Sequence, residues 1–173
     1  MKKQMSAVLL LSSWIFVAVI HGAQPQTSGD VSARVFNSAD ISVPQMRVGE
    51  WKTLTFDSER WDTANLHDIA ANTGRMKAPV AGKYAIFANI TWETPLGSGF
   101  WGLRLLLNGK TPIAEQTLPN NGSSFRTSMS LGTVYALNAG DYVEVQVFQN
   151  SGGALTVKRI NATSPEFAVI KAP

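Results

Sequence analysis

The residues that could support catalysis are few, and the search for them begins with the histidines. The sequence has only two, His21 and His67, and it has no cysteine. A Ser-His-Asp relay needs a histidine that a separate acid orients toward an activated serine. Asp68 directly follows His67 and would point to the opposite side of an extended strand. The Gly-x-Ser-x-Gly turn of the α/β-hydrolases is also absent, so we expect no catalytic residues and a protein that is not an enzyme.

Acidic residues are densest just before His67 and Asp68, where Asp57, Glu59 and Asp62 could offer oxygen ligands to calcium. Calcium takes about 6–8 oxygen ligands in proteins. Arg60 lies inside the cluster, however, and the spacing of the acids matches no calcium loop. The three carboxylates are weak calcium candidates. The pattern favours a solvated loop with local ion pairs, so we expect no metal and no cofactor.

Two tryptophans and two asparagines indicate where a ligand could bind. Trp92 and Trp101 flank a glycine-rich segment, residues 94–99, and such rings can stack on sugars. Tryptophans of β-sandwiches nevertheless more often belong to the core. The polar segment 118–124 could form a recognition loop, because exposed tips commonly carry binding residues. The candidates for ligand loops are Trp92, Trp101, Asn120 and Asn121.

The N-terminus has the pattern of a secretory signal peptide. Lys2 and Lys3 precede an apolar stretch at residues 7–20, and small residues follow at Gly22 and Ala23. A transmembrane helix needs about 20 apolar residues, and this stretch is shorter. We therefore expect a signal peptide at residues 1–23, no membrane span after its removal, and a secreted protein that is extracellular or periplasmic.

The charge of the remaining chain argues against nucleic acid as a partner. Without Lys2 and Lys3, 13 of the 15 basic residues remain against 12 acidic ones, so the net charge is +1 rather than +3. No basic run is longer than Lys158-Arg159, and a nucleic-acid surface needs clustered basic residues. Residues 24–32 are a short polar linker, and residues 33–173 have the length of one domain. Three Asn-x-Ser/Thr triplets match the glycosylation signal, at Asn89, Asn121 and Asn161.

Short runs of strand-forming residues recur through this domain with turn residues between them, which is typical of an all-β sandwich. No segment shows a sustained helical period, although residues 63–71 could make one helical turn. About ten strands are expected, at residues 33–37, 50–56, 75–78, 83–93, 100–107, 111–116, 125–137, 141–149, 154–158 and 167–171.

Three of these strands carry apolar residues on both faces. Side chains alternate between the two faces of a strand, so the strand that contains Phe87 turns this ring away from its other apolar residues. Leu106 likewise faces away from the leucines on either side of it. In the strand after Gly140, the valines form one face and the aromatic residues the other. Aromatic residues are enriched at subunit interfaces, and the predicted interface consists of Phe87, Leu106, Tyr142 and Phe148.

Several motifs, taken in order, resemble the globular head of the complement C1q family, a jelly roll related to tumour necrosis factor. The resemblance covers about residues 35–170. It rests on Phe56 with Asp62, on the segment GRMKAPVAGKY at residues 74–84, on Leu107-Asn108-Gly109, on the pattern from Leu137 to Val145, and on Pro165-Glu166-Phe167. The chain departs from the family pattern at Met76 and Ile86, where aromatic residues are usual, and it lacks the usual glycine after Phe167.

The resemblance implies a two-sheet antiparallel jelly-roll sandwich in a divergent, microbial member of the family. Family heads are typically trimers whose aromatic residues pack near the three-fold axis. The implied function is that of a secreted, non-enzymatic homotrimeric module that presents loops to a protein or glycan ligand. The alternatives are a monomeric carbohydrate-binding or surface-structural sandwich and a small secreted hydrolase.

Two Ala-Gly-x-Tyr segments carry the structural residues of this pattern. Gly82 and Gly140 are each expected in a turn with positive φ, which glycine adopts readily. Asp141 is expected to accept backbone hydrogen bonds in its turn. Tyr84 is expected in the core, whereas Tyr142 is expected on the outer face.

Overall fold

The structure, a computed structural model, describes residues 29–95, 97–122 and 124–173. The predicted signal peptide and residues 24–28 of the linker lie outside the described residues. Within the described ranges every regular element is a β-strand, and these ranges contain no helix that could span a membrane. The all-β prediction is confirmed.

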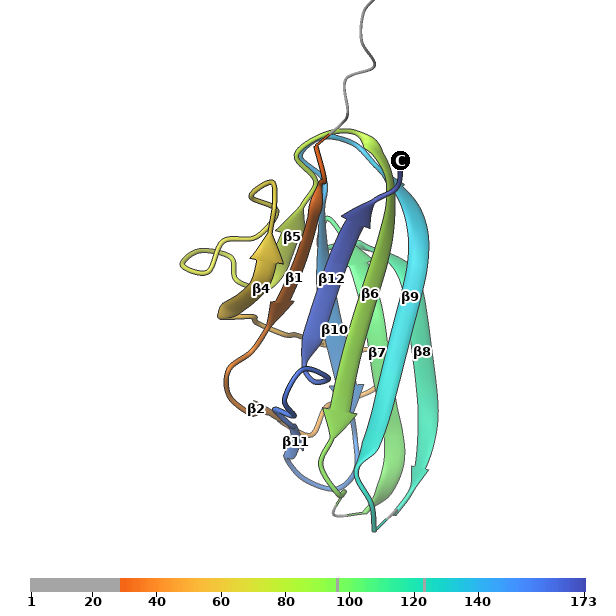
Figure 1. Ribbon diagram of the computed structural model, residues 1–173. Coiled ribbons are helices and arrows are strands. Elements are labelled where there is room, and N and C mark those ends of the chain that lie inside the picture. Colours follow the sequence, from red (N-terminus) through yellow and green to blue (C-terminus); the bar gives the residue numbers. More distant parts are fainter. Residues whose placement is uncertain (1–28, 96, 123) are drawn as a thin grey trace, which may run out of the picture.

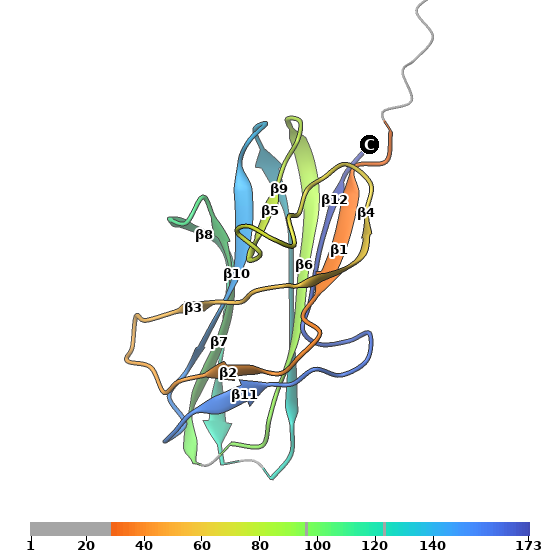
Figure 2. The ribbon, with the colours of Figure 1, turned by 90° about the vertical axis from the view of Figure 1, so that its left-hand side faces the viewer.

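Two antiparallel sheets pack face to face, as two views at right angles to each other show (Figure 1 and Figure 2). The seven-stranded sheet has the order β2-β11-β6-β12-β1-β4, with β9 on the other side of β6, and the five-stranded sheet has the order β3-β10-β7-β8, with β5 also paired to β10. The strands are β1 (Ser32–Phe36), β2 (Ile41–Val43), β3 (Lys52–Thr53), β4 (Ser58–Asp62), β5 (Arg75–Lys77), β6 (Gly82–Trp92), β7 (Ser98–Leu107), β8 (Thr111–Asn121), β9 (Thr127–Leu137), β10 (Tyr142–Gln149), β11 (Leu155–Val157) and β12 (Glu166–Lys171).

This arrangement is the predicted jelly-roll sandwich, with two strands more than expected. β2 and β4 were not predicted, because one is three residues long and the other, Ser-Glu-Arg-Trp-Asp, has no alternation of polar and apolar residues. β4 forms because it pairs with β1 at the edge of the seven-stranded sheet. The strand expected at residues 50–56 is regular only at Lys52–Thr53, and residues 63–71 form no helix.

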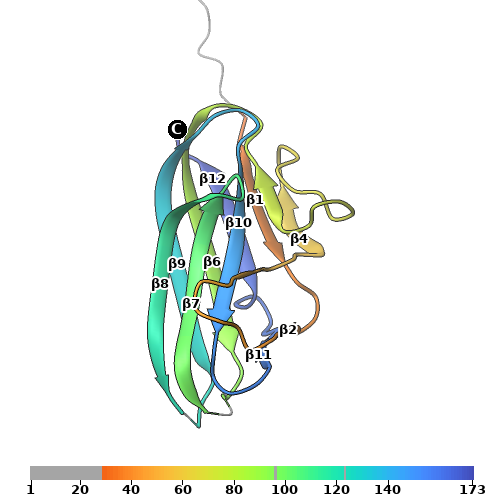
Figure 3. The ribbon, with the colours of Figure 1, turned by 180° about the vertical axis from the view of Figure 1, so that it is seen from behind.

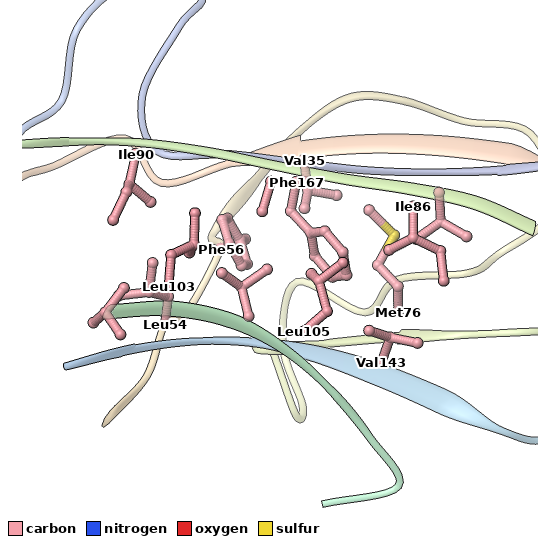
Figure 4. Close-up of a cluster of buried hydrophobic side chains, with 14 of the residues drawn as sticks. Val35, Leu54, Phe56, Met76, Ile86, Ile90, Leu103, Leu105, Val143 and Phe167 are labelled. Carbon is pink, nitrogen blue, oxygen red and sulfur yellow. The ribbon is translucent and has the colours of Figure 1, made fainter. Parts of the chain in front are cut away.

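The core lies between the sheets and is filled by the alternating residues that the sequence indicated (Figure 4). Leu103, Leu105 and Val143 face the even-numbered residues of β6, and each of them is fully buried. Tyr84 is buried as well, and its hydroxyl donates a hydrogen bond of 2.7 Å to the carbonyl of Val80. Burial raises the pKa of Tyr84. This bond offsets the cost of burying the tyrosine hydroxyl in the core.

Candidate functional site

The tryptophan candidates are part of the core, so the prediction that they could stack on a sugar is wrong. Trp92 is 0% and Trp101 2% exposed. Their rings stack on each other with centroids 6.3 Å apart and planes 22° apart. Both residues occupy inward positions, one on β6 and one on β7, and these strands belong to opposing sheets. No ligand can reach either ring from solvent.

The asparagine candidates lie in a strand rather than in a loop. β8 continues to Asn121, and its last two residues pair with Gly99 and Ser98 of β7. Asn120 is 3% exposed; its amide nitrogen donates to the carbonyl of Gly97 over 2.7 Å, and its amide oxygen accepts from the backbone of Gly122 over 3.0 Å. Asn120 is therefore structural. The prediction of a recognition loop at residues 118–124 is wrong for residues 118–121, which belong to β8. Asn121 is exposed.

The acidic candidates serve separate structural roles. Asp57 binds the backbone and hydroxyl of Ser38 over 2.8 and 2.7 Å. Asp62 accepts backbone hydrogen bonds from the segment that follows it, among them that of His67 over 2.9 Å. Glu59 lies 3.0 Å from Nδ1 of His67. Glu59 and Asp62 thus both bind His67, while Asp57 binds Ser38. The described residues contain no cluster of three His, Cys, Asp or Glu side chains that could hold a metal ion.

His67 joins two segments rather than activating a serine. Its side chain is fully buried between Glu59 on β4 and the carbonyl of Thr73, which lies 3.1 Å from Nε2. Both neighbours are hydrogen-bond acceptors, so each ring nitrogen has a structural partner. The ring thus fastens the 63–74 loop to the edge of the seven-stranded sheet.

The two Ala-Gly-x-Tyr segments differ in the reason for their glycine. Gly140 has φ of +91°, in the region that favours glycine. Asp141 follows it, and its carboxylate accepts from the backbone of Asn138 over 2.7 Å and from the amide of Asn108 over 2.8 Å. Gly82, in contrast, does not have the expected positive φ; it is the first residue of β6, and a Cβ there would lie 2.7 Å from Cε of Lys171.

The four residues of the predicted interface do not form one patch. Leu106, Tyr142 and Phe148 lie on the outer face of the five-stranded sheet, whereas Phe87 lies on the outer face of the other sheet. Leu106 is only 4% and Phe148 only 6% exposed, so neighbours in the same chain already cover them. Tyr142 is half-buried, with the guanidinium of Arg75 4.2 Å from its ring centroid. Only Phe87, at 46%, is broadly exposed.

Phe87 is the centre of an apolar area on the outer face of the seven-stranded sheet, which we call the Phe87 patch. Phe87 pairs with Gly132 of β9 on one side and with Ala168 of β12 on the other, so its flanking residues are too small to cover its ring. A Cβ at Gly132 would lie 2.8 Å from Cδ1 of Phe87. In the next row of the sheet, Ala85 lies between two large exposed residues. The patch comprises Ala85, Phe87, Gly132, Val134, Ala168 and Ile170.

A buried ion cluster borders the Phe87 patch. The side chain of Glu166 is 2% exposed and binds Arg34 over 2.8 Å and Arg60 over 2.9 Å. Asn89 lies opposite Glu166 on the same face. Sequence reasoning missed Val134 and Ile170, which are 65% and 38% exposed. Their alternation with inward-facing neighbours could have indicated them, but their pairing with β6 could not be read from the sequence.

Comparison with solved structures identifies the fold. The chain has the same jelly-roll fold as solved structures related to tumour necrosis factor. Murine APRIL, in a crystal structure at pH 5.0, is similar with a TM-score of 0.61 and 10% identity, over 83% of this chain and 99% of that one. The Eiger TNF of S. frugiperda has a TM-score of 0.55 and 15% identity, over 83% and 93%. No protein-family model matches the sequence, and no curated protein matches it.

Proposed function

We propose that this chain is a secreted, non-enzymatic binding module that assembles as a homotrimer. The observation that carries the proposal is the Phe87 patch, which leaves large apolar side chains unpartnered on a sheet of the tumour necrosis factor fold. The resemblance to the C1q head implies three copies around an axis lined with aromatic residues. Signal-peptide cleavage near Ala23 would deliver the domain to the outside of the cell, where it would bind a protein or glycan.

The Phe87 patch has the properties of an association surface. It combines a half-exposed aromatic ring with Val134 and Ile170, and contiguous apolar areas on soluble proteins commonly mark binding surfaces. Aromatic residues are enriched in interfaces and charged residues are depleted from their centres. The patch fits this description, because its charged neighbours, Arg34 and Glu166, lie at its border and bind each other.

Leu106 and Phe148 are not part of this proposal, since side chains of the same protomer cover them. Tyr142 lies on the five-stranded sheet, so it would join the interface only if the contact extended from the Phe87 patch to that sheet. The proposed contact is therefore narrower than the sequence suggested. It depends on Phe87 and on the other residues of the Phe87 patch.

The mass of the mature protein in solution tests the proposal. Light scattering at micromolar concentration should give three times the mass of one chain. Phe87→Glu should yield monomers, because each buried, unpaired carboxylate costs several kcal/mol. Phe100→Glu is the matched control: Phe100 is 50% exposed, similar to Phe87 at 46%, but it lies on the five-stranded sheet. It should leave the mass unchanged.

Two results would contradict the proposal. A wild-type protein that remains monomeric at micromolar concentration would favour the monomeric carbohydrate-binding or surface-structural sandwich. A trimer that survives Phe87→Glu would remove the Phe87 patch from the interface. The small secreted hydrolase would return to consideration only if turnover of a generic ester or glycoside disappeared with a change at His67.

A further inference from the structure

The five-stranded sheet faces the viewer when the molecule is seen from behind (Figure 3). A second surface feature lies on the outer face of this sheet. It is an open hollow of about 420 Å³, which we call the Trp51 hollow. This volume lies within the range of roughly 300–1,000 Å³ that is typical of small-molecule sites. The loop between β2 and β3 projects beside the sheet (Figure 2) and supplies one wall. The hollow is lined by Val48, Gly49, Trp51, Phe100, Glu115, Thr117, Phe148 and Asn150.

The floor of the Trp51 hollow is aromatic and closely packed. Trp51 and Phe148 have ring centroids 5.8 Å apart. Gly102 of β7 lies beneath them, and a Cβ there would be 2.6 Å from Cη2 of Trp51. The guanidinium of Arg104 lies 4.2 Å from the centroid of the Trp51 ring and does not line the hollow. The indole is thus held in place by its own chain while part of it remains open to the hollow.

The rim of the Trp51 hollow is polar and offers both hydrogen-bond donors and acceptors. Glu115 is half-exposed, and its closest charged partner among the described residues, Arg104, is 4.0 Å away. Asn150 uses its amide oxygen to accept from the backbone of Phe100 over 2.6 Å. No hydrogen bond engages its amide NH2, or the hydroxyl of Thr117, within the part of the chain that the structure describes. A carboxylate, a hydroxyl and an amide therefore surround an aromatic floor, all available to a ligand.

We propose that the Trp51 hollow binds a pyranose ring of a glycan. A pyranose has an apolar C–H face that packs on an aromatic ring, and hydroxyl groups around its edge that both donate and accept hydrogen bonds. The floor formed by Trp51 and Phe148 matches the face, and the rim formed by Glu115, Thr117 and Asn150 matches the edge. A quaternary ammonium ion would use the aromatic rings but could not accept hydrogen bonds from the amide or the hydroxyl.

The site is complete within one chain, so the inference does not depend on trimerisation. If the trimer forms, three such sites would act together, and avidity could strengthen binding to a clustered glycan by about 10²–10⁴-fold. The affinity of a single site for a monosaccharide would be the same in the trimer and in the Phe87→Glu monomer. Failure of one proposal is therefore distinguishable from failure of the other.

NMR titration with methyl glycosides of galactose, glucose and mannose tests the inference. The indole N–H signal of Trp51, assigned by its loss in Trp51→Phe, should shift and saturate with at least one glycoside. For a ligand of this size we expect a Kd on the order of 1 mM. Glu115→Gln should weaken binding about tenfold, because it removes a charged acceptor. Trp51→Ala should abolish binding.

Tyr142→Ala is the matched control. Tyr142 lies on the same outer face and also has a guanidinium 4.2 Å from its ring, but it is not part of the hollow, so binding should be unchanged. Because Trp51→Ala could impair folding, the exposed Glu115→Gln variant carries the test by itself. The inference is overturned if no glycoside shifts the Trp51 signal up to about 50 mM, far above the expected Kd. Wild-type affinity in Glu115→Gln, or binding of choline chloride but of no glycoside, would overturn it as well.

Discussion

Glu166→Gln provides the sharpest test of how this sandwich is stabilised. Glu166 is the first residue of β12, and its side chain is 2% exposed. One carboxylate oxygen accepts from Arg34 on β1 and the other from Arg60 on β4, over 2.8 and 2.9 Å. The two arginines also donate to the carbonyls of Ala162 and Asn161. Glutamine keeps the shape of the side chain but removes the charge that both arginines share.

The expected loss follows from the number and exposure of these bonds. Hydrogen bonds to charged groups contribute about 1.5–3 kcal/mol each, and neutral ones about 0.5–1.5 kcal/mol. The side chains of Arg34 and Arg60 are 32% and 29% exposed, so solvent reduces the effect below that of a fully buried pair. We expect Glu166→Gln to lower the free energy of unfolding by about 2–3 kcal/mol. For a domain of this size, the Tm should fall by about 4–12 °C.

Urea denaturation followed by tryptophan fluorescence measures this loss. Glu115→Gln is the matched control, because it makes the same substitution at a half-exposed glutamate that lies 4.0 Å from Arg104. A pair at this distance, with a carboxylate that is 44% exposed, should change stability by about 0.5 kcal/mol or less. Both variants need the same protein concentration, since assembly couples to stability. If Glu166→Gln lost no more than Glu115→Gln, the ion cluster would not stabilise the fold.

Three further predictions concern packing and charge. Gly102→Val should displace the Trp51 indole, change the near-UV circular dichroism and cost about 1–3 kcal/mol; an unchanged spectrum would contradict the close packing. Leu103→Ala should cost about 2–5 kcal/mol, measured by urea denaturation, and more than Leu107→Ala at a partly buried position; equal losses would contradict the core assignment. Hydrogen bonds from Lys158 and from the backbone of Arg159 hold the pKa of Asp40 below its ordinary value of 3.8. The ionised Asp40 therefore contributes to the free energy of unfolding above pH 3.8, and this contribution is lost as the pH falls through the folded-state pKa. Asp40→Asn should therefore lose less stability than the wild type on acidification below pH 4, and an identical acid transition would show that Asp40 does not contribute.

The fold was predictable because its main signals are local. Alternation of side chains in β6 and β10 reports which residues face the core, since the period of a strand is two whatever the strand pairs with. The resemblance of the turn and strand motifs to the C1q head then implied the jelly roll. β4 could not be predicted, because its polar sequence forms a strand only through its pairing with β1.

The predicted sites were less accurate, because a binding site depends on which residues meet across sheets. Alternation correctly put Phe148 on an outer face, but it could not show that Trp51, from a distant loop, covers that face. For the same reason, Trp92 and Trp101 were considered as a ligand platform although they stack on each other between the sheets.

By itself, the sequence determined the longer strands, the faces of their residues and the sandwich that follows, because these depend on local periodicity and on turns. Only the tertiary structure decided which outward residues remain exposed, because exposure depends on neighbours that are distant in sequence. Phe87 stays open because its neighbours on β9 and β12 are glycine and alanine. Trp51 and Phe148 form the floor of a hollow because Gly102 leaves room for the indole.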